Sequence, residues 1–246
     1  MKNNIVNIDA SKSYSLYVDK VLERSKQEII SWFSISNLDF KVTTYIYKDK
    51  DSLRSGLRRH YLKEYPSYLE ACMIDQDESL GINRSINIYE PSDKSDNKSY
   101  SKKEYNQVIF HELVHYITDI LFGKLPEWLT EGIAKLLDGS YQEDITSLMK
   151  NHINNYEVPE VSNMKGDFFC IINPNYQLEQ STTQYIYNGY DFSYIMVRYI
   201  IEFYGKDYLF ELMKNKESII QVQQSILIEA INYFNAKYCK ESTIKI

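Results

Sequence analysis

The sequence has no excess of basic residues: 28 Lys and Arg stand against 34 Asp and Glu, which gives a formal net charge of −6. A nucleic-acid binder usually presents a basic face to the phosphates. The acidic balance offers no such electrostatic footprint, so we expect no nucleic-acid partner.

Long apolar runs are absent as well. The best candidate, residues 194–201, is short and contains Arg198, whereas a membrane-spanning helix needs about 20 apolar residues. We therefore expect no membrane span. The polar first residues do not resemble a secretory signal, so the sequence predicts a cytoplasmic location.

Cysteines are few. The three in the chain are far apart, form no Cys-x-x-Cys pair and are odd in number, which argues against a disulfide framework and indicates reduced thiols. Core material is plentiful, because 43% of the residues are hydrophobic and 14% are aromatic. This composition excludes a fully disordered chain.

The first ninety residues alternate between helical and extended patterns. Apolar residues recur at helical spacing over residues 13–33, and β-branched and aromatic residues predict a strand over residues 40–47. Ser52 is placed to cap a short helix that runs toward Leu62. A second strand is predicted at Ser85–Tyr89.

The rest of the chain is predicted to be mainly helical. Residues 91–103 are almost wholly polar and indicate a solvated loop, with a lid over a neighbouring site as the alternative. Residues 140–183 have an irregular pattern of loop and short helices. Helices are predicted over residues 104–122, 126–137, 189–203, 206–213 and 217–238.

A His-Glu-x-x-His motif lies within the first of these helices, at residues 111–115. Residues four apart on a helix share one face, so His111 and His115 can bind a single metal ion. Glu112 lies beside them, where its carboxylate can take a proton from a metal-bound water. Zinc lowers the pKa of such a water to about 7 and makes hydroxide available at neutral pH.

The surroundings of the motif favour the metal interpretation. Composition alone predicts about 0.005 chance occurrences in a chain like this one. Apolar residues fill most other positions of the helix, and unpaired buried polar groups cost several kcal/mol, so the histidines and the glutamate need partners. A metal ion supplies that partner; hydrogen bonds made by the histidines within a core are the alternative.

A catalytic zinc usually has three protein ligands and one open position. The remaining histidines, His60 and His152, do not stand in a ligand-like context, so a carboxylate is the better third ligand. Glu131 follows His115 by sixteen positions, in the next predicted helix. If that helix turns back onto the first, Glu131 faces the two histidines and Gly132 permits a close approach of the helices.

The His-Glu-x-x-His motif and the block Trp-Leu-x-Glu-Gly-x-Ala at residues 128–134 resemble the gluzincin metallopeptidases. The second block looks like that of the M1 aminopeptidases, and the compact layout resembles the smaller peptidase-MA-like proteins. The resemblance implies a zinc ion held by His111, His115 and Glu131, with Glu112 as general base and acid. The spacing between motif and block is slightly shorter than in the M1 aminopeptidases, and no Gly-Ala-Met-Glu-Asn-like motif lies upstream, which counts against aminopeptidase activity.

A second stretch is similar as well. Residues 190–199, followed by Tyr204 and Gly205, look like the Tyr-x-x-Ser helix that follows the zinc helices in peptidase-MA-like proteins. Tyr190 is the matching position, where a phenol could donate a hydrogen bond to the oxyanion formed on the attacked carbonyl. Capping or packing of its own helix is the alternative role for Tyr190, and Tyr187 is the second candidate donor.

The resemblance also implies roles outside the ligand set. In gluzincins the strand before the zinc helix is a sheet edge that binds the peptide substrate by strand addition, and Ser85–Tyr89 has that place in the chain. Asp119, one turn beyond His115, either orients a ligand or is a surface carboxylate. Lys135 stands where some relatives carry an acidic partner of the ligands, a departure that leaves the three ligands unchanged.

The sequence therefore predicts an α+β protein of two parts. A small N-terminal α/β part with a mostly antiparallel sheet ends in the zinc helix and covers residues 1–122. A mainly helical C-terminal part, residues 123–246, carries the third ligand. Helix is expected to exceed strand by a wide margin.

The leading functional hypothesis is a zinc metallopeptidase, a hydrolase with Zn2+ as its cofactor and a peptide or protein as its substrate. A narrower version cuts one cellular protein only, as regulatory metallopeptidases do. The alternative is a non-catalytic zinc-containing regulatory or binding protein of the same fold. Structural zinc sites generally fill all four positions and favour Cys, and Glu112 would have no role in one.

Overall fold

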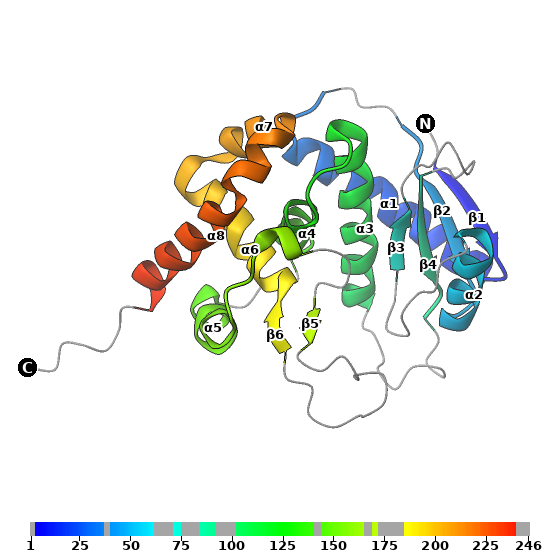
Figure 1. Ribbon diagram of the computed structural model, residues 1–246. Coiled ribbons are helices and arrows are strands. Elements are labelled where there is room, and N and C mark those ends of the chain that lie inside the picture. Colours follow the sequence, from blue (N-terminus) through cyan, green and yellow to red (C-terminus); the bar gives the residue numbers. More distant parts are fainter. Residues whose placement is uncertain are drawn as a thin grey trace, which may run out of the picture. The chain divides into compact units, whose positions relative to one another are not determined.

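Figure 1 shows the protein, a computed structural model, as a ribbon. The chain divides into two units, Met1–Leu121 and Phe122–Ile246. The structure describes residues 3–36, 40–61, 71–74, 84–91, 102–139, 144–164, 169–171 and 185–239.

The first unit begins with strand β1 (Asn4–Ile8) and helix α1 (Lys12–Trp32). The side chain of Ser11 caps the helix by accepting a hydrogen bond from the backbone N–H of Tyr14, at 3.2 Å. An apolar stripe at helical spacing is fully buried and contains Val18, Leu22 and Ile29. The helix is the one that the sequence predicts, whereas β1 is an addition to the prediction.

Four strands form one sheet in the order β1-β2-β4-β3. The others are β2 (Thr43–Tyr47), β3 (Ala71–Ile74) and β4 (Ser85–Tyr89). β1 pairs with β2, and β2 with β4, in parallel; β3 pairs with β4 antiparallel. The prediction of a mostly antiparallel sheet is therefore wrong, because the sheet is mixed and most of its pairings are parallel.

The connections along the chain explain the parallel pairing. A parallel neighbour requires a crossover of a dozen or more residues, usually a helix, and α1 is such a crossover between β1 and β2. β1 leaves little trace in the sequence, since it is a five-residue strand with two asparagines. Without β1, α1 is not recognisable as a crossover.

β4 is an interior strand. It lies between β2 and β3, and all five of its residues are buried. The expectation that Ser85–Tyr89 is a sheet edge is therefore wrong. Among the described strands that edge belongs to β3, which comes shortly before β4 in the chain and pairs along its outer side.

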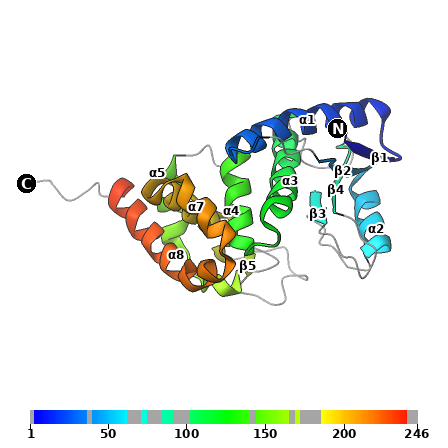
Figure 2. The same ribbon diagram turned by 90° about the horizontal axis from the view of Figure 1, so that it is seen from above.

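Helices flank the sheet of the first unit on both sides (Figure 2). α2 (Lys50–Tyr61) covers one face, where Leu53 and Leu57 join Tyr47 and Tyr89 in a buried cluster. α1 runs along the opposite side of the strands. The interior strand β4 is buried on both faces, as is usual for a strand in parallel pairing.

Asp49 caps α2. Its carboxylate accepts a hydrogen bond from the backbone N–H of Ser52 at 2.7 Å, and hydrogen bonds from the side chain and backbone of Ser52 lower the pKa of Asp49. The helix begins at Lys50, so the capping side chain comes three residues earlier than the predicted Ser52.

The second unit is mainly helical. In its described part the α-helices are α4 (Glu127–Leu137), α5 (Ile145–Asn151), α6 (Gly189–Tyr199), α7 (Lys206–Lys214) and α8 (Lys216–Tyr238). Between α6 and α7 lies a π-helical turn, η4 (Ile200–Tyr204). Two 3-10 turns, η2 (Ile153–Asn155) and η3 (Val161–Asn163), follow α5. β5 (Phe169–Ile171) pairs antiparallel with β6 (Tyr185–Asn188).

The structure agrees with most of the helices that the sequence predicts and adds to them. α4, α7 and α8 match their predicted ranges to within about two residues, and the helix predicted over residues 189–203 is α6 continued by η4. α5 and β5 lie in the segment with the irregular pattern. Helix exceeds strand by a wide margin among the described residues, as predicted.

Two further expectations concern the surface and the membrane. Residues 92–101 of the predicted polar loop lie outside the described residues. Within the described ranges, every helix is too short or too polar to cross a bilayer.

Gly132 marks the closest approach between α4 and a neighbouring helix. A Cβ at this position would lie 2.3 Å from the backbone oxygen of Ser193 and 2.6 Å from Cγ2 of Val197, both on α6. The sequence suggested that this glycine permits a close approach to the histidine helix. In the structure the close approach is to α6. A glycine in a helix signals a close neighbour without identifying it.

We predict that Gly132→Ala lowers the free energy of unfolding by about 1–3 kcal/mol, because the added methyl group overlaps the backbone of α6. Denaturant unfolding followed by circular dichroism measures this change. Helix propensity alone would act in the opposite direction, since alanine is favoured over glycine by about 1 kcal/mol within a helix. A stabilised variant would contradict the close contact.

Candidate metal centre

Helix α3 (Lys102–Phe122) carries the His-Glu-x-x-His motif. Its side chains His111, Glu112 and His115 are half-buried. The neighbouring apolar face is fully buried and contains Ile109, Leu113, Val114 and Ile117. Apolar surroundings strengthen the electrostatic interactions of the polar groups that remain, because the local dielectric constant is low.

The two imidazoles meet on one turn of α3. Nε2 of His111 lies 3.0 Å from Nε2 of His115, and the ring centroids are 4.7 Å apart with an angle of 72° between the planes. Side chains four residues apart on a helix are neighbours, so this meeting follows from local spacing.

Glu131 comes from α4, which begins shortly after α3 ends. Gly123 follows the last residue of α3 with φ +66°, the left-handed conformation with which many helices terminate. His111, His115 and Glu131 each offer one ligand atom, and these atoms all lie within 4.8 Å of one another.

The rotation of α4 about its axis is restricted by contacts within the second unit. The Trp128 side chain is almost fully buried, and its Nε1–H donates a hydrogen bond to Oε1 of Gln223 on α8, at 3.1 Å. Gly132 lies against α6. Two anchors one turn apart determine the direction in which the intervening Glu131 points, and they explain why the Trp and Gly accompany the Glu in this block.

The residues present fit a zinc ion. Two imidazole nitrogens and one carboxylate oxygen are a common ligand set of catalytic zinc, with the fourth position open. Two nitrogens on one tetrahedral zinc, each at about 2.05 Å, lie roughly 3.3 Å apart, close to the 3.0 Å between His111 Nε2 and His115 Nε2. A hydrogen bond between the imidazoles has a similar length, so measurement of bound metal distinguishes the two.

Several contacts tie α3 to the sheet of the first unit. Asp119 forms an ion pair with Arg84, immediately before β4. The hydroxyl of Tyr116 donates to the backbone oxygen of Lys41 at 3.0 Å, and burial raises the pKa of Tyr116. Asp119 is thus partnered by a cation that the sequence reading did not identify, since Arg84 is far from it in the chain.

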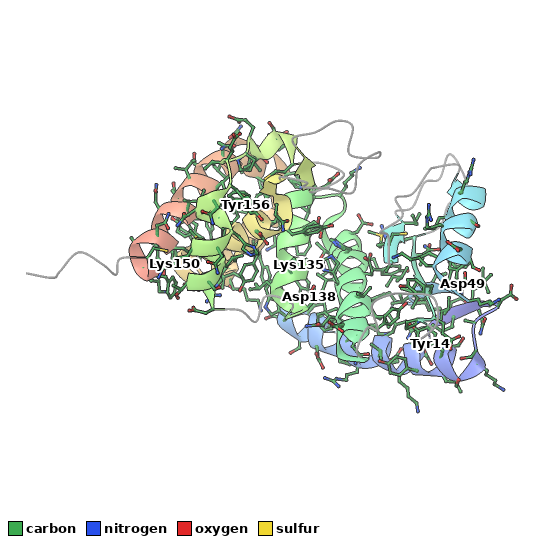
Figure 3. The ribbon with its side chains drawn as sticks, turned by 90° about the horizontal axis from the view of Figure 1, so that it is seen from below. Tyr14, Asp49, Lys135, Asp138, Lys150 and Tyr156 are labelled. Carbon is green, nitrogen blue, oxygen red and sulfur yellow. The ribbon has the colours of Figure 1, made fainter. Side chains whose placement is uncertain are left out.

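Tyr190 lies in the first turn of α6, where the side chain of Asn188 caps the helix by accepting from the Tyr190 N–H at 3.0 Å. The ring of Tyr190 lies 5.2 Å from Nζ of Lys135, which is labelled on α4 in Figure 3. Lys135 is one turn beyond Glu131, so this contact places Tyr190 against the part of α4 that follows the candidate ligand. The side chain of Tyr187 lies outside the described residues.

Of the other two histidines, His152 is described. Its Nδ1 lies 3.0 Å from Oδ2 of the buried Asp191 on α6. The sequence places His152 outside any ligand-like context, and the structure gives it a carboxylate neighbour far along the chain. His60 has no described side chain.

Comparison with known proteins gives one family. A family model described as the peptidase MA superfamily matches residues 85–236, more than half of the chain. The match includes α3, α4 and α6, and therefore all of the candidate site residues. A search among curated proteins finds no match.

We predict about one divalent metal ion per chain in protein purified without chelators or a metal-binding tag. Loss of a residue that only hydrogen-bonds to a metal ligand weakens metal affinity roughly 10–100-fold. Glu131→Ala removes a ligand itself, so it should weaken metal affinity by more than that. Elemental analysis of both proteins, with Glu127→Ala as a control on the same helix, measures this. Metal-free wild-type protein that takes up none on reconstitution would show that the histidines are hydrogen-bonded core residues.

Proposed function

The chain belongs to the peptidase MA superfamily, and from this premise we propose that it is a zinc-dependent metallopeptidase. Membership of this superfamily supports a metal-dependent peptidase, which acts on peptides or proteins. The proposal adds the metal, the gluzincin type of site and the role of each residue. The cluster of His111, His115 and Glu131 is the observation that supports it most directly.

In this proposal His111, His115 and Glu131 hold the zinc ion, and the fourth position stays open. A bound zinc ion would polarise the scissile carbonyl and lower the pKa of water at that position. The chain contributes three ligand atoms that all lie within 4.8 Å of one another. Such preorganisation reduces the reorganisation needed during the reaction.

Glu112 is the proposed general base and acid. It follows His111 directly on α3 and is half-buried beside an apolar face. Its carboxylate takes the proton of the attacking water and passes it to the amine that leaves. The peptide nitrogen is a poor leaving group until it is protonated, so this transfer is required for cleavage.

Tyr190 is the proposed oxyanion donor. Its place against Lys135, one turn after Glu131, supports a role near the ligands. A cation beside a phenol ring strengthens the hydroxyl as a hydrogen-bond donor, because it favours negative charge on the oxygen. The hydroxyl would donate to the oxygen of the attacked carbonyl as negative charge develops there.

β3 replaces β4 as the proposed strand for substrate binding. A peptide can add to a sheet only where backbone groups are unpaired, and β4 is paired on both sides. β3 is the outer neighbour of β4 among the described strands, so its outer side is the available edge. Main-chain pairing there would bind peptides with little regard to their sequence.

We predict that Glu112→Gln keeps the metal and loses at least about 100-fold in kcat, the lower range for general acid–base catalysis. The amide has almost the same shape but cannot accept the proton. Cleavage of a quenched fluorescent peptide library, together with metal content, measures both effects. Glu104→Gln, an exposed residue in the first turn of the same helix, is the matched control, and undiminished cleavage by Glu112→Gln would contradict the mechanism.

We predict that Tyr190→Phe lowers kcat by about 100-fold or more, with KM and metal content nearly unchanged, because only the transition state loses a hydrogen bond. Tyr187→Phe serves as the comparison. A large loss in the Tyr187 variant with an active Tyr190 variant would assign the oxyanion to Tyr187 instead. Full activity in both would remove the phenol from the mechanism.

A further inference from the structure

Aromatic rings gather on the surface of the second unit, where η4 lies against α8. This aromatic cluster consists of Tyr199, Phe203, Tyr204, Tyr208 and Tyr233. Each ring contacts at least one other ring of the cluster, with the two centroids 4.7–5.4 Å apart. Phe203 is 59% exposed, Tyr204 43% and Tyr208 38%.

Such a surface needs a physical explanation. Contiguous exposed apolar groups on a protein surface frequently mark an interaction site, and tyrosine and phenylalanine are enriched in interfaces. The π-helical turn η4 (Ile200–Tyr204) carries two of the exposed rings, and π-turns inside helices often occur at functional sites.

A carboxylate lies beside the cluster and forms no ion pair with any described residue. Oε2 of Glu229, on α8, accepts hydrogen bonds from the hydroxyls of Tyr199 at 2.9 Å and Tyr204 at 3.1 Å. Burial and the hydrogen bond to Glu229 raise the pKa of Tyr199, which therefore remains a donor. Glu229 is exposed, and among the described residues no Lys, Arg or His lies within ion-pair distance of it.

A neighbouring carboxylate in the same cluster shows what this chemistry binds. Glu202 holds Nζ of Lys237 at 2.8 Å, and that ammonium group lies 5.2 Å from the ring centroid of Tyr233. Nε of Arg198 lies 2.7 Å from the other oxygen of Glu202. A carboxylate beside aromatic rings thus binds two cations of the chain itself. Glu229 also lies beside aromatic rings, and no cation of the described residues pairs with it.

We propose that Glu229, Tyr204 and Phe203 form a binding site for an arginine side chain of a partner protein. The guanidinium group would lie against an exposed ring and donate hydrogen bonds to the Glu229 carboxylate. Arginine suits this site better than lysine, because its planar group stacks on aromatic rings and matches a carboxylate. The net charge of −6 also favours approach of a basic segment.

This inference is independent of the proposed peptidase activity and is tested by binding. Fluorescence anisotropy is recorded with a labelled peptide of alternating D-arginine and glycine, which resists cleavage. The same peptide with citrulline in place of arginine retains the shape and removes the charge. We expect the arginine peptide to bind the full chain at least about tenfold more tightly at low salt, as a charged hydrogen bond would provide.

Two variants examine the site. Glu229→Gln keeps an oxygen acceptor for the phenols and removes the charge, and Tyr204→Ala removes an exposed ring; each should reduce this binding about tenfold. Glu217→Gln changes the net charge equally at the distant start of α8, about 18 Å along the helix, and should bind like the wild type. Circular dichroism confirms that each variant is folded.

Three results would overturn the proposal. The first is equal binding of the arginine and citrulline peptides. The second is an equal loss in the Glu229 and Glu217 variants, which would indicate unspecific attraction to an acidic protein. The third is a dimer in sedimentation that Phe203→Ser abolishes, since a second copy of this chain would then cover the aromatic cluster.

Discussion

The contact on which the candidate centre depends is the meeting of two imidazole nitrogens, 3.0 Å apart on one turn of α3. Spacing along a helix makes residues four apart neighbours and so permits this contact. The fully buried apolar residues on the same helix remove water from one side of the pair. A catalytic zinc usually has a third protein ligand, and a carboxylate oxygen of Glu131 lies within 4.8 Å of both imidazoles.

The position of Glu131 depends in turn on neighbouring residues of α4 that are not candidate metal ligands. Trp128 is bonded to Gln223 on α8, and Gly132 lets the backbone of α6 approach to a distance that no other residue permits. Such packing is rigid because it leaves no room for movement. The same helix α6 carries Tyr190 in its first turn, so one close helix contact positions both the candidate ligand and the candidate oxyanion donor.

The periodicity of apolar residues predicted the parts of the fold that depend on near neighbours in the sequence. The long helices and the strand Ser85–Tyr89 were legible because their apolar periodicity is strong. The arrangement of the strands was not. Parallel pairing depends on which segment lies between two strands in space, and a short strand with two asparagines gives no sign of its neighbour. For the same reason the sequence assigned the sheet edge to β4, whereas in the structure β3 lies at that edge.

The sequence by itself determined the candidate ligands and the charge: the His-Glu-x-x-His spacing, the carboxylate in the next helix and the acidic net charge follow from residue types and intervals. Only the tertiary structure decided the partners. It paired Asp119 with Arg84, His152 with Asp191 and Gly132 with α6, and it gathered the aromatic cluster around Glu229. The physical reason is that helical periodicity fixes neighbours within a few residues, whereas contacts between distant segments arise from packing of the whole unit.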